Sequence, residues 1–303
     1  MASAIEWTDN AVPVVTGCTN KGAGCKHCYA VPLAWRLAHH PHPALAARYA
    51  GTVEKRPDGT LVWTGRVNLN LDQLDAIQRA RRPQTWFLSH MGDLFHDAVP
   101  AAVVDAVLAV AALKPEQRLI LLTKRPERAA ELLAGPKARP NIWVGASVAH
   151  DRDAAEAAPH LRALHLAGWR TMVSYEPALG AVDWDANGLD FLDWLISGGE
   201  SGPNARPTHP DWHRAALSFC RAYGIAFFFK QWGEWAPHYG DISRARLAVC
   251  KYGSSPFEIA AGERARQFAL LDRCQMVRVG KKAAGHFLDG RAWQQVPWAE
   301  SAS

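Results

Sequence analysis

The middle of the chain repeats one pattern: a short apolar segment, a polar or glycine-containing turn, and an alanine-rich helical stretch. The segments that we expect to form strands are Thr85 to Ser89, Arg118 to Thr123, Asn141 to Ala146, Arg170 to Ser174, Asp193 to Ser197 and Ile225 to Lys230. Their apolar runs are nearly continuous, which is typical of strands covered on both faces of a parallel sheet. With Val12 to Thr16 as a first strand, the pattern predicts an α/β fold: an open or partial TIM-like (β/α) barrel of six to seven parallel strands.

Two regions lie outside this repeat. Residues 39–69 contain Pro41, Pro43 and the turn signal Arg56-Pro57-Asp58-Gly59, and we expect an insertion that carries a β-hairpin between Gly51 and Val67. The tail from about residue 241 is less regular, and its segments 276–282 and 286–293 favour a small strand-rich appendix or lid. We therefore expect a barrel domain over residues 1–240, with the insertion at 39–69, and a C-terminal appendix over 241–303.

Polar side chains follow the expected strands where each strand ends. In chain order these candidate site residues are Asp93, Lys124, Arg125, Ser147, Glu176, Glu200 and Lys230. Parallel α/β folds keep their functional sites at the carboxyl ends of their strands, so we expect these side chains to share one rim. Glu176, Glu200 and Lys230 end the later strands, and we expect them to be the catalytic residues that face the substrate.

Three cysteines, Cys18, Cys25 and Cys28, are crowded into one glycine-rich loop near the N-terminus. Clustered thiols in a chain without a secretion signal are more often metal ligands than disulfides. A structural zinc site normally has four protein ligands, and His27 or His39 would have to supply the fourth. His27, however, lies between two of the cysteines, and no second zinc knuckle follows in the sequence. A four-iron, four-sulfur cluster with one open iron, which can bind a reactant, therefore fits the residues better.

The spacing Cys-x6-Cys-x2-Cys, with Tyr29 directly after the last cysteine, resembles the cluster loop of radical S-adenosylmethionine enzymes, although the usual spacing between their first two cysteines is shorter. A closer resemblance covers nearly the whole chain and is to the radical-SAM-like three-cysteine-motif family of phages and prophages. The strings that carry it are Ile5-Glu6-Trp7-Thr8, the cysteine loop, Met91-Gly92-Asp93-Leu94-Phe95-His96, Leu122-Thr123-Lys124-Arg125-Pro126, Gly198-Gly199-Glu200-Ser201-Gly202, Phe229-Lys230-Gln231-Trp232-Gly233-Glu234-Trp235 and Val279-Gly280-Lys281-Lys282-Ala283-Ala284-Gly285.

The resemblance implies a [4Fe-4S] cluster held by Cys18, Cys25 and Cys28, whose open iron binds S-adenosyl-L-methionine. An electron from a donor such as flavodoxin or ferredoxin would cleave the sulfonium and give a 5′-deoxyadenosyl radical, which abstracts a substrate hydrogen.

The same resemblance assigns roles to the cofactor-binding residues. Asp93 would accept a hydrogen bond from the methionine amino group, Lys124 or Arg125 would neutralise the methionine carboxylate, and Ser147 would contact the ribose or the carboxylate. Tyr29 is placed among these residues by its position after Cys28. Gly198-Gly199-Glu200 is similar to the Gly-Gly-Glu motif of the superfamily but follows the sixth strand, so either Glu200 faces the substrate or the strand count is shifted.

The substrate that we expect is a nucleic-acid base or a nucleotide derivative, with modification of a phage DNA base as the specific hypothesis. A formal net charge of +5 permits such a substrate. Trp7, Trp35, Trp63, Trp232 and Trp235 lie where a ring could stack on a base, but for any single one of them burial as a large apolar group is the favoured interpretation. The alternatives are a zinc-stabilised, non-catalytic nucleic-acid-binding protein and a photoproduct-lyase-like DNA repair enzyme. No apolar run is long enough to span a bilayer, so we expect no membrane partner and a place in the cytoplasm, that of the host if a phage encodes the chain.

Overall fold

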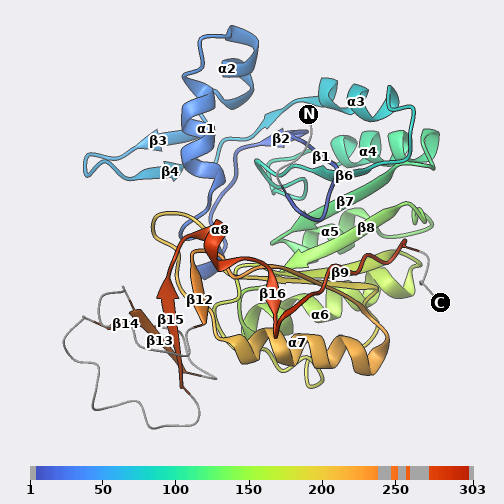
Figure 1. Ribbon diagram of the computed structural model, residues 1–303. Helices are drawn as coiled ribbons and strands as arrows, with labels where there is room; N and C mark the ends of the chain where they lie inside the picture. The colour runs from blue at the N-terminus through green and yellow to red at the C-terminus, as the bar shows by residue number, and fades with distance from the viewer. Residues whose placement is uncertain (1–4, 238–246, 252–256, 260–272, 300–303) are drawn as a thin grey trace. The chain divides into compact units, whose positions relative to one another are not determined.

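The computed structural model describes residues 5–237, 247–251, 257–259 and 273–299, and Figure 1 shows how their helices and strands follow one another along the chain. The chain divides into two compact units. The first unit comprises the residues up to 146 together with 159–172, and the second comprises 147–158 and the residues from 173 onward. The division passes through helix α6 (Asp151–Leu166), so each unit contains part of that helix.

One sheet contains seven strands in the order β1-β6-β7-β8-β9-β10-β11. Their bounds are β1 (Asn10–Val12), β6 (Thr85–Leu88), β7 (Arg118–Thr123), β8 (Ile142–Ser147), β9 (Arg170–Tyr175), β10 (Trp194–Gly198) and β11 (Ala226–Gln231). The connecting helices after β6, β7 and β10 are α4 (Ala101–Leu113), α5 (Pro126–Leu132) and α7 (Pro210–Tyr223). The expected α/β fold with an open parallel sheet of seven strands is confirmed, and the apolar runs in β6 and β10 are buried throughout.

The first expected strand is divided in two. Residues 12–16 were expected to form one strand, but β1 ends at Val12 and pairs in parallel with β6, while β2 (Val15–Thr16) pairs antiparallel with β5 (Asn68–Leu69). Pro13 lies between them, and a proline has no N–H to donate to a strand ladder. The break allows the chain to leave the main sheet just before the cysteine loop.

The insertion at residues 39–69 contains the expected hairpin, formed by β3 (Val53–Lys55) and β4 (Leu61–Trp63). It also contains a helix that the sequence pattern did not predict, α2 (Pro43–Tyr49). The remaining short helices of the first unit are η1 (Ala23–Cys25), α1 (Ala30–Ala38), η2 (Leu71–Leu74) and α3 (Asp75–Gln78).

Helix α7 in the second unit begins and ends at recognisable capping residues. The His209 side chain accepts a hydrogen bond from the Asp211 backbone N–H, and Pro210 occupies the first helical position. Gly224 ends the helix in the left-handed conformation, with φ of 70°.

The buried face of α7 carries His213, which is fully inaccessible to solvent. The His213 ring nitrogens lie 2.7 Å from Ser197 Oγ and 2.9 Å from Thr208 Oγ1, so both are satisfied. Burial and, to a smaller extent, the neighbouring charges of His209 and Arg214 together lower the pKa of His213 to about 3. The ring is therefore a neutral part of the core.

The C-terminal region of the second unit is strand-rich, as expected. Its four-stranded sheet has the order β12-β15-β13-β14 and consists of β12 (Trp235–Pro237), β15 (Arg273–Arg278), β13 (Leu247–Lys251) and β14 (Phe257–Ile259). The helix α8 (Lys281–Ala284) and the hairpin of β16 (Phe287–Leu288) and β17 (Arg291–Ala292) follow. The expected domain boundary at residue 240 lies outside the described residues and stays a prediction. Within the described part of the chain, no helix combines the length and the apolar character needed to cross a membrane.

Candidate functional site

The cysteine loop begins where two glycine backbones touch. Gly17 forms a parallel bridge with Gly92, and the Gly17 N–H donates a 3.0 Å hydrogen bond to the Met91 carbonyl. A Cβ on Gly92 would lie 2.6 Å from the Val15 carbonyl oxygen, and a Cβ on Gly17 would lie 2.1 Å from that of Arg66. Only glycine fits at either position, so the residue before Cys18 is held against the segment that follows β6.

The other end of the loop is held by packing. Cys28 is half-buried against a cluster formed by the apolar face of α1, by Tyr49 of α2 and by Met91. Met91 is completely buried, and it lies in the same segment that bonds Gly17. One end of the loop is thus bonded to residues 91–92, and the other end packs against a cluster that includes Met91.

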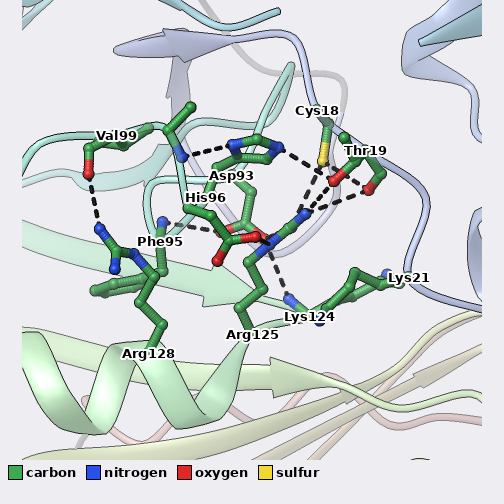
Figure 2. A network of polar contacts seen from close by, with 12 residues as sticks. Cys18, Thr19, Lys21, Asp93, Phe95, His96, Val99, Lys124, Arg125 and Arg128 are labelled. Carbon is green, nitrogen blue, oxygen red and sulfur yellow. Dashed lines mark hydrogen bonds and ion pairs between the residues drawn. The ribbon is translucent and has the colours of Figure 1, made fainter. Parts of the chain in front are cut away.

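Cys18 is also held by an arginine from the turn after β7. The Arg125 guanidinium donates from Nη1 to Cys18 Sγ at 3.8 Å and from Nη2 to the Thr19 hydroxyl, as Figure 2 shows. The same Nη1 lies 2.9 Å from Asp93 Oδ2. The Arg125 side chain is only 3% exposed and that of Asp93 6%, so this is a buried ion pair. Arg125 therefore links the loop to the rim of the sheet.

The Asp93 carboxylate is saturated by donors of the protein. Its Oδ1 accepts hydrogen bonds from the Phe95 N–H at 3.0 Å and the Thr123 hydroxyl at 2.7 Å. Its Oδ2 accepts from Arg125 and, at 3.4 Å, from the Lys124 backbone N–H. A carboxylate offers about four acceptor positions. The expected bond from Asp93 to a cofactor amino group stays a prediction, and in this structure Asp93 orients Arg125.

His96 completes the network around Thr19. Its Nδ1 accepts a 3.1 Å hydrogen bond from the Ala98 N–H, so the ring proton lies on Nε2, which is 3.1 Å from the Thr19 hydroxyl. Burial lowers the pKa of His96, and the nearby Arg125 charge lowers it further. A neutral His96 therefore donates to Thr19. Thr19 and His96 were not predicted as site residues, although both lie in the strings that carry the family resemblance.

The thiols of the loop lie in a partly desolvated environment. Burial raises the pKa of Cys18 to about 11, and Asp93 adds to the rise while Arg125 opposes it. Burial also raises the pKa of Cys28, which the charge of Lys124 opposes. The charge of a Cys25 thiolate would raise the pKa of both neighbours, so the three groups are electrostatically coupled. Binding of a metal would therefore release protons from these thiols.

The loop offers three thiols, which is the donor set of a four-iron cluster with one open iron. Within the described residues, no three His, Cys, Asp or Glu side chains gather closely enough to hold a single metal ion. In a four-iron cluster each thiolate binds a different iron, so the sulfurs surround a volume and do not meet at a point. His39, a candidate zinc ligand, places Nδ1 2.8 Å from the Trp35 carbonyl oxygen of its own helix. The donor set of three coupled thiols is thus compatible with a cluster.

The structure separates Lys124 from Arg125. Lys124 is half-buried beside Cys28, and within the described chain its ammonium group makes no hydrogen bond or ion pair. Arg125 is engaged by Asp93, Thr19 and Cys18. Of the two cations predicted to neutralise a cofactor carboxylate, Lys124 is the one that remains available.

The two other predicted cofactor residues stay predictions. The Tyr29 hydroxyl donates a 2.8 Å hydrogen bond to the His90 carbonyl, and the residue is 53% exposed. Ser147 is the last residue of β8 and the first residue that belongs to the second unit. Within the described residues, its hydroxyl has no hydrogen-bond partner.

A second polar cluster, here called the Glu176 cluster and formed by Ser174, Glu176 and Lys230, lies in the second unit. Lys230 Nζ is 3.0 Å from Glu176 Oε1, and Ser174 Oγ donates to Glu176 Oε2 at 3.2 Å. The side chains of Glu176 and Lys230 are 14% and 17% exposed. Unlike Asp93, Glu176 thus retains acceptor capacity for a ligand.

A β-bulge places Lys230 in this cluster. Ser197 pairs with Phe229 and Gly198 with Gln231, so Lys230 is an extra residue in β11. A bulge redirects the side chain of the extra residue. A Cβ at Gly198 would lie 2.8 Å from Glu176 Oε1, so the glycine leaves room for the carboxylate.

Glu200 is held by a different partner. Its Oε2 accepts 2.8 Å hydrogen bonds from both the backbone N–H and the Nε of Arg206, and Oε1 accepts from Nη2. The pair fixes the turn after β10, and Glu200 is 6% exposed. The catalytic role predicted for Glu200 stays a prediction. Arg206 was not predicted, because nothing in its local sequence distinguishes it from a solvated arginine.

The five tryptophans for which stacking on a base was considered are buried or partly buried in the protein. Trp7 and Trp232 are 5% exposed and Trp235 is completely buried. The Trp232 and Trp235 indole N–H groups donate to the carbonyls of Phe287 and Ala205. Trp35 and Trp63 are partly buried against the α1 cluster. For Trp7, Trp232 and Trp235 the favoured interpretation, burial as large apolar groups, is confirmed, and stacking on a base is not available to them.

Comparison with known proteins gives a family for the chain. A family model described as "Protein of unknown function (DUF5131)" matches residues 2–297. No curated protein matches. Two similar solved structures are a spore photoproduct lyase complexed with dinucleoside spore photoproduct, at a TM-score of 0.41, and a mutant of that enzyme with bound AdoMet and the dinucleoside, at 0.40. Both are 14% identical and cover 88% of this chain and 72% of their own. With TM-scores below 0.5, this likeness carries no argument about activity.

Proposed function

Since the chain belongs to the DUF5131 family, whose description names no activity, its own residues must indicate its chemistry, and we propose that it is a radical S-adenosylmethionine enzyme. The observation that carries the proposal is the loop of three coupled thiols, anchored at both ends and joined by Arg125 to the carboxyl end of β7. Three protein ligands leave one iron of a [4Fe-4S] cluster for a cofactor.

The proposal gives a role to each of four residues of the first unit. Cys18, Cys25 and Cys28 hold the cluster, and all three side chains are partly buried. Lys124 offers its unpaired ammonium to the carboxylate of S-adenosylmethionine, where a charge-assisted hydrogen bond would form. When bound, the cluster and S-adenosylmethionine supply the one-electron chemistry that generates a radical able to abstract a hydrogen atom.

The Glu176 cluster is proposed to bind the substrate. Glu176 can accept hydrogen bonds from N–H groups, and Lys230 can donate to carbonyl oxygens, which suits the polar edge of a nucleobase. A nucleic-acid base or a nucleotide derivative is therefore the proposed substrate, with a modified phage DNA base as the specific hypothesis. The net charge of +5 supports a polyanionic partner.

The test of the cofactor begins with metal analysis. Protein purified without oxygen should contain about four irons and four sulfides per chain, and after dithionite reduction it should convert S-adenosylmethionine to 5′-deoxyadenosine. Cys25→Ala and Cys28→Ala should abolish cluster assembly. Cys220→Ala is the matched control, because Cys220 is buried in α7 of the second unit. Full iron content in the Cys28→Ala variant would contradict the ligand assignment.

The same preparation separates the alternatives. One equivalent of zinc without iron or sulfide would favour a non-catalytic nucleic-acid-binding protein. If the cluster is present, intact and ultraviolet-damaged DNA can be compared as stimulants of deoxyadenosine formation. Stimulation by damaged DNA alone would favour a photoproduct-lyase-like repair enzyme over a base-modifying one.

A further inference from the structure

We propose that Arg125 tunes the cluster through Cys18: its guanidinium, held by Asp93, donates a hydrogen bond to the Cys18 sulfur and raises the reduction potential of the cluster. The inference rests on the proposed function, since it requires Cys18 to be a cluster ligand. It assigns Arg125 a positioning and electronic role that differs from the predicted contact with a cofactor carboxylate.

The three sulfurs have different hydrogen-bond donors. Cys18 Sγ accepts from the Arg125 guanidinium, which is a cation. Cys25 Sγ accepts from the Lys21 backbone N–H at 3.5 Å, and the Cys28 thiol lies in reach of the Ala30 and Val31 backbone N–H groups. Charge-assisted hydrogen bonds are about twice as strong as neutral ones. Among the described contacts to these sulfurs, the one at Cys18 therefore has the largest effect on the electron density of its ligand.

Arg125 has little freedom to point elsewhere. Nη1 is shared between Asp93 and Cys18, Nη2 binds Thr19, and the side chain is 3% exposed. Asp93 is itself fixed by the Thr123 hydroxyl and by two backbone N–H groups. The donor is thus preorganised before any cluster binds. A lysine has one ammonium group in place of this planar fork and cannot reproduce the three contacts.

The direction of the effect follows from electrostatics. Reduction adds negative charge to the cluster, and a hydrogen bond or a cation at a ligating sulfur stabilises that charge. Removing the Arg125 guanidinium therefore makes the cluster harder to reduce. Asp93 partly cancels the charge of Arg125, so the guanidinium acts on Cys18 mainly through its hydrogen bond.

The experiment is a redox titration of the reconstituted full-length protein, followed by the electron paramagnetic resonance signal of the reduced cluster. Arg125→Gln should retain iron and sulfide, while its ratio of reduced to oxidised cluster at a fixed potential falls at least tenfold. A tenfold change corresponds to about 59 mV for a one-electron couple. Arg125→Lys should give a shift of the same sign and smaller size.

Arg128→Gln is the matched control, because Arg128 lies one turn further along α5 and donates to the Val99 carbonyl without contacting a cysteine. Its potential should equal that of the wild type. If Arg125→Gln does not retain its cluster, the reduction potential of Arg125→Lys is compared with that of the wild type instead. An unchanged potential in the variant that retains the cluster would overturn the inference and leave the proposed function standing. A wild-type protein without a cluster would overturn both.

Discussion

Two acid–base pairs at strand ends differ in how fully the protein satisfies their carboxylates. Asp93, paired with Arg125, accepts four hydrogen bonds from the chain and is almost inaccessible. Glu176, paired with Lys230, accepts from Lys230 and Ser174 and is 14% exposed. A saturated carboxylate holds other protein groups in place, whereas an unsaturated one can still bind a ligand. The first pair is therefore read as a positioning device and the second as a recognition site.

The largest expected difference between the two pairs is in the free energy of unfolding that is lost when each carboxylate is replaced by an amide. Asp93→Asn removes the closer and more buried of the two carboxylates beside Arg125, since Asp97 Oδ2, 3.7 Å from Arg125 Nε, belongs to a side chain that is 74% exposed. We expect a loss of about 3 kcal/mol in the free energy of unfolding. Glu176→Gln leaves Lys230 with access to water, and we expect about 1 kcal/mol. Urea denaturation of both variants measures the difference.

The surface pair of Arg48 and Asp72 supplies the control, because the Asp72 side chain is 59% exposed. Asp72→Asn should change the free energy of unfolding by less than about 1 kcal/mol. Equal losses in Asp93→Asn and Glu176→Gln would remove the distinction between a positioning pair and a recognition pair.

Acid should lower the free energy of unfolding through His213, a residue of the second unit that belongs to neither pair. The pKa of His213 is lowered to about 3 in the fold, against about 6.5 in the unfolded chain. Its contribution is fully present above pH 6.5 and is lost as the pH falls, because only the unfolded state then binds the proton. Between pH 7 and pH 5 we expect a loss of about 2 kcal/mol from this residue.

The measurement is the urea midpoint as a function of pH, with His213→Gln as the comparison. Glutamine keeps a donor and an acceptor for Ser197 and Thr208 but does not titrate in this range. If the urea midpoint of His213→Gln falls with decreasing pH as steeply as that of the wild type, other groups cause the acid sensitivity.

The smallest expected effect concerns Lys124. Its substitution by glutamine removes the unpaired cation beside Cys28 and should weaken binding of S-adenosylmethionine about tenfold, or about 1.4 kcal/mol, with little change in unfolding. Isothermal titration calorimetry on the reconstituted protein measures the affinity. Lys137→Gln is a suitable control, because Lys137 is paired with Asp105 away from the cysteines. Equal affinities in the wild type and the Lys124 variant would remove Lys124 from the cofactor site.

The strands were predictable because their apolar runs are continuous and their ends are polar. β7 has the predicted bounds. β6 and β9 differ from the prediction by one residue at one end, and β8, β10 and β11 are shifted by one residue at both ends. The broken first strand was less predictable, because Pro13 can lie at a strand edge as well as between two strands. The helix α2 was missed because Pro41 and Pro43 were read as loop signals, although Pro43 occupies the first helical turn.

The candidate site was predictable as residue types and not as contacts. The position of Lys124 and Arg125 after β7 was visible in the sequence, but which of them binds Asp93 depends on tertiary packing. The choice of Glu200 overlooked Arg206, six residues away, because a turn of unknown shape separates them. Lys230 was predicted at a strand end, yet its direction depends on a bulge that has no distinct composition.

The contact between Arg125 and Cys18 spans 107 residues of sequence. A ribosome that has just released the cysteine loop must still synthesise that length before the guanidinium exists, which takes roughly 5–20 s at common rates of translation. During this interval the thiols lack the partner that fixes Cys18 and Thr19. A site in which Arg125 already holds Cys18 and Thr19 therefore exists only after β7 and the start of α5 have been synthesised.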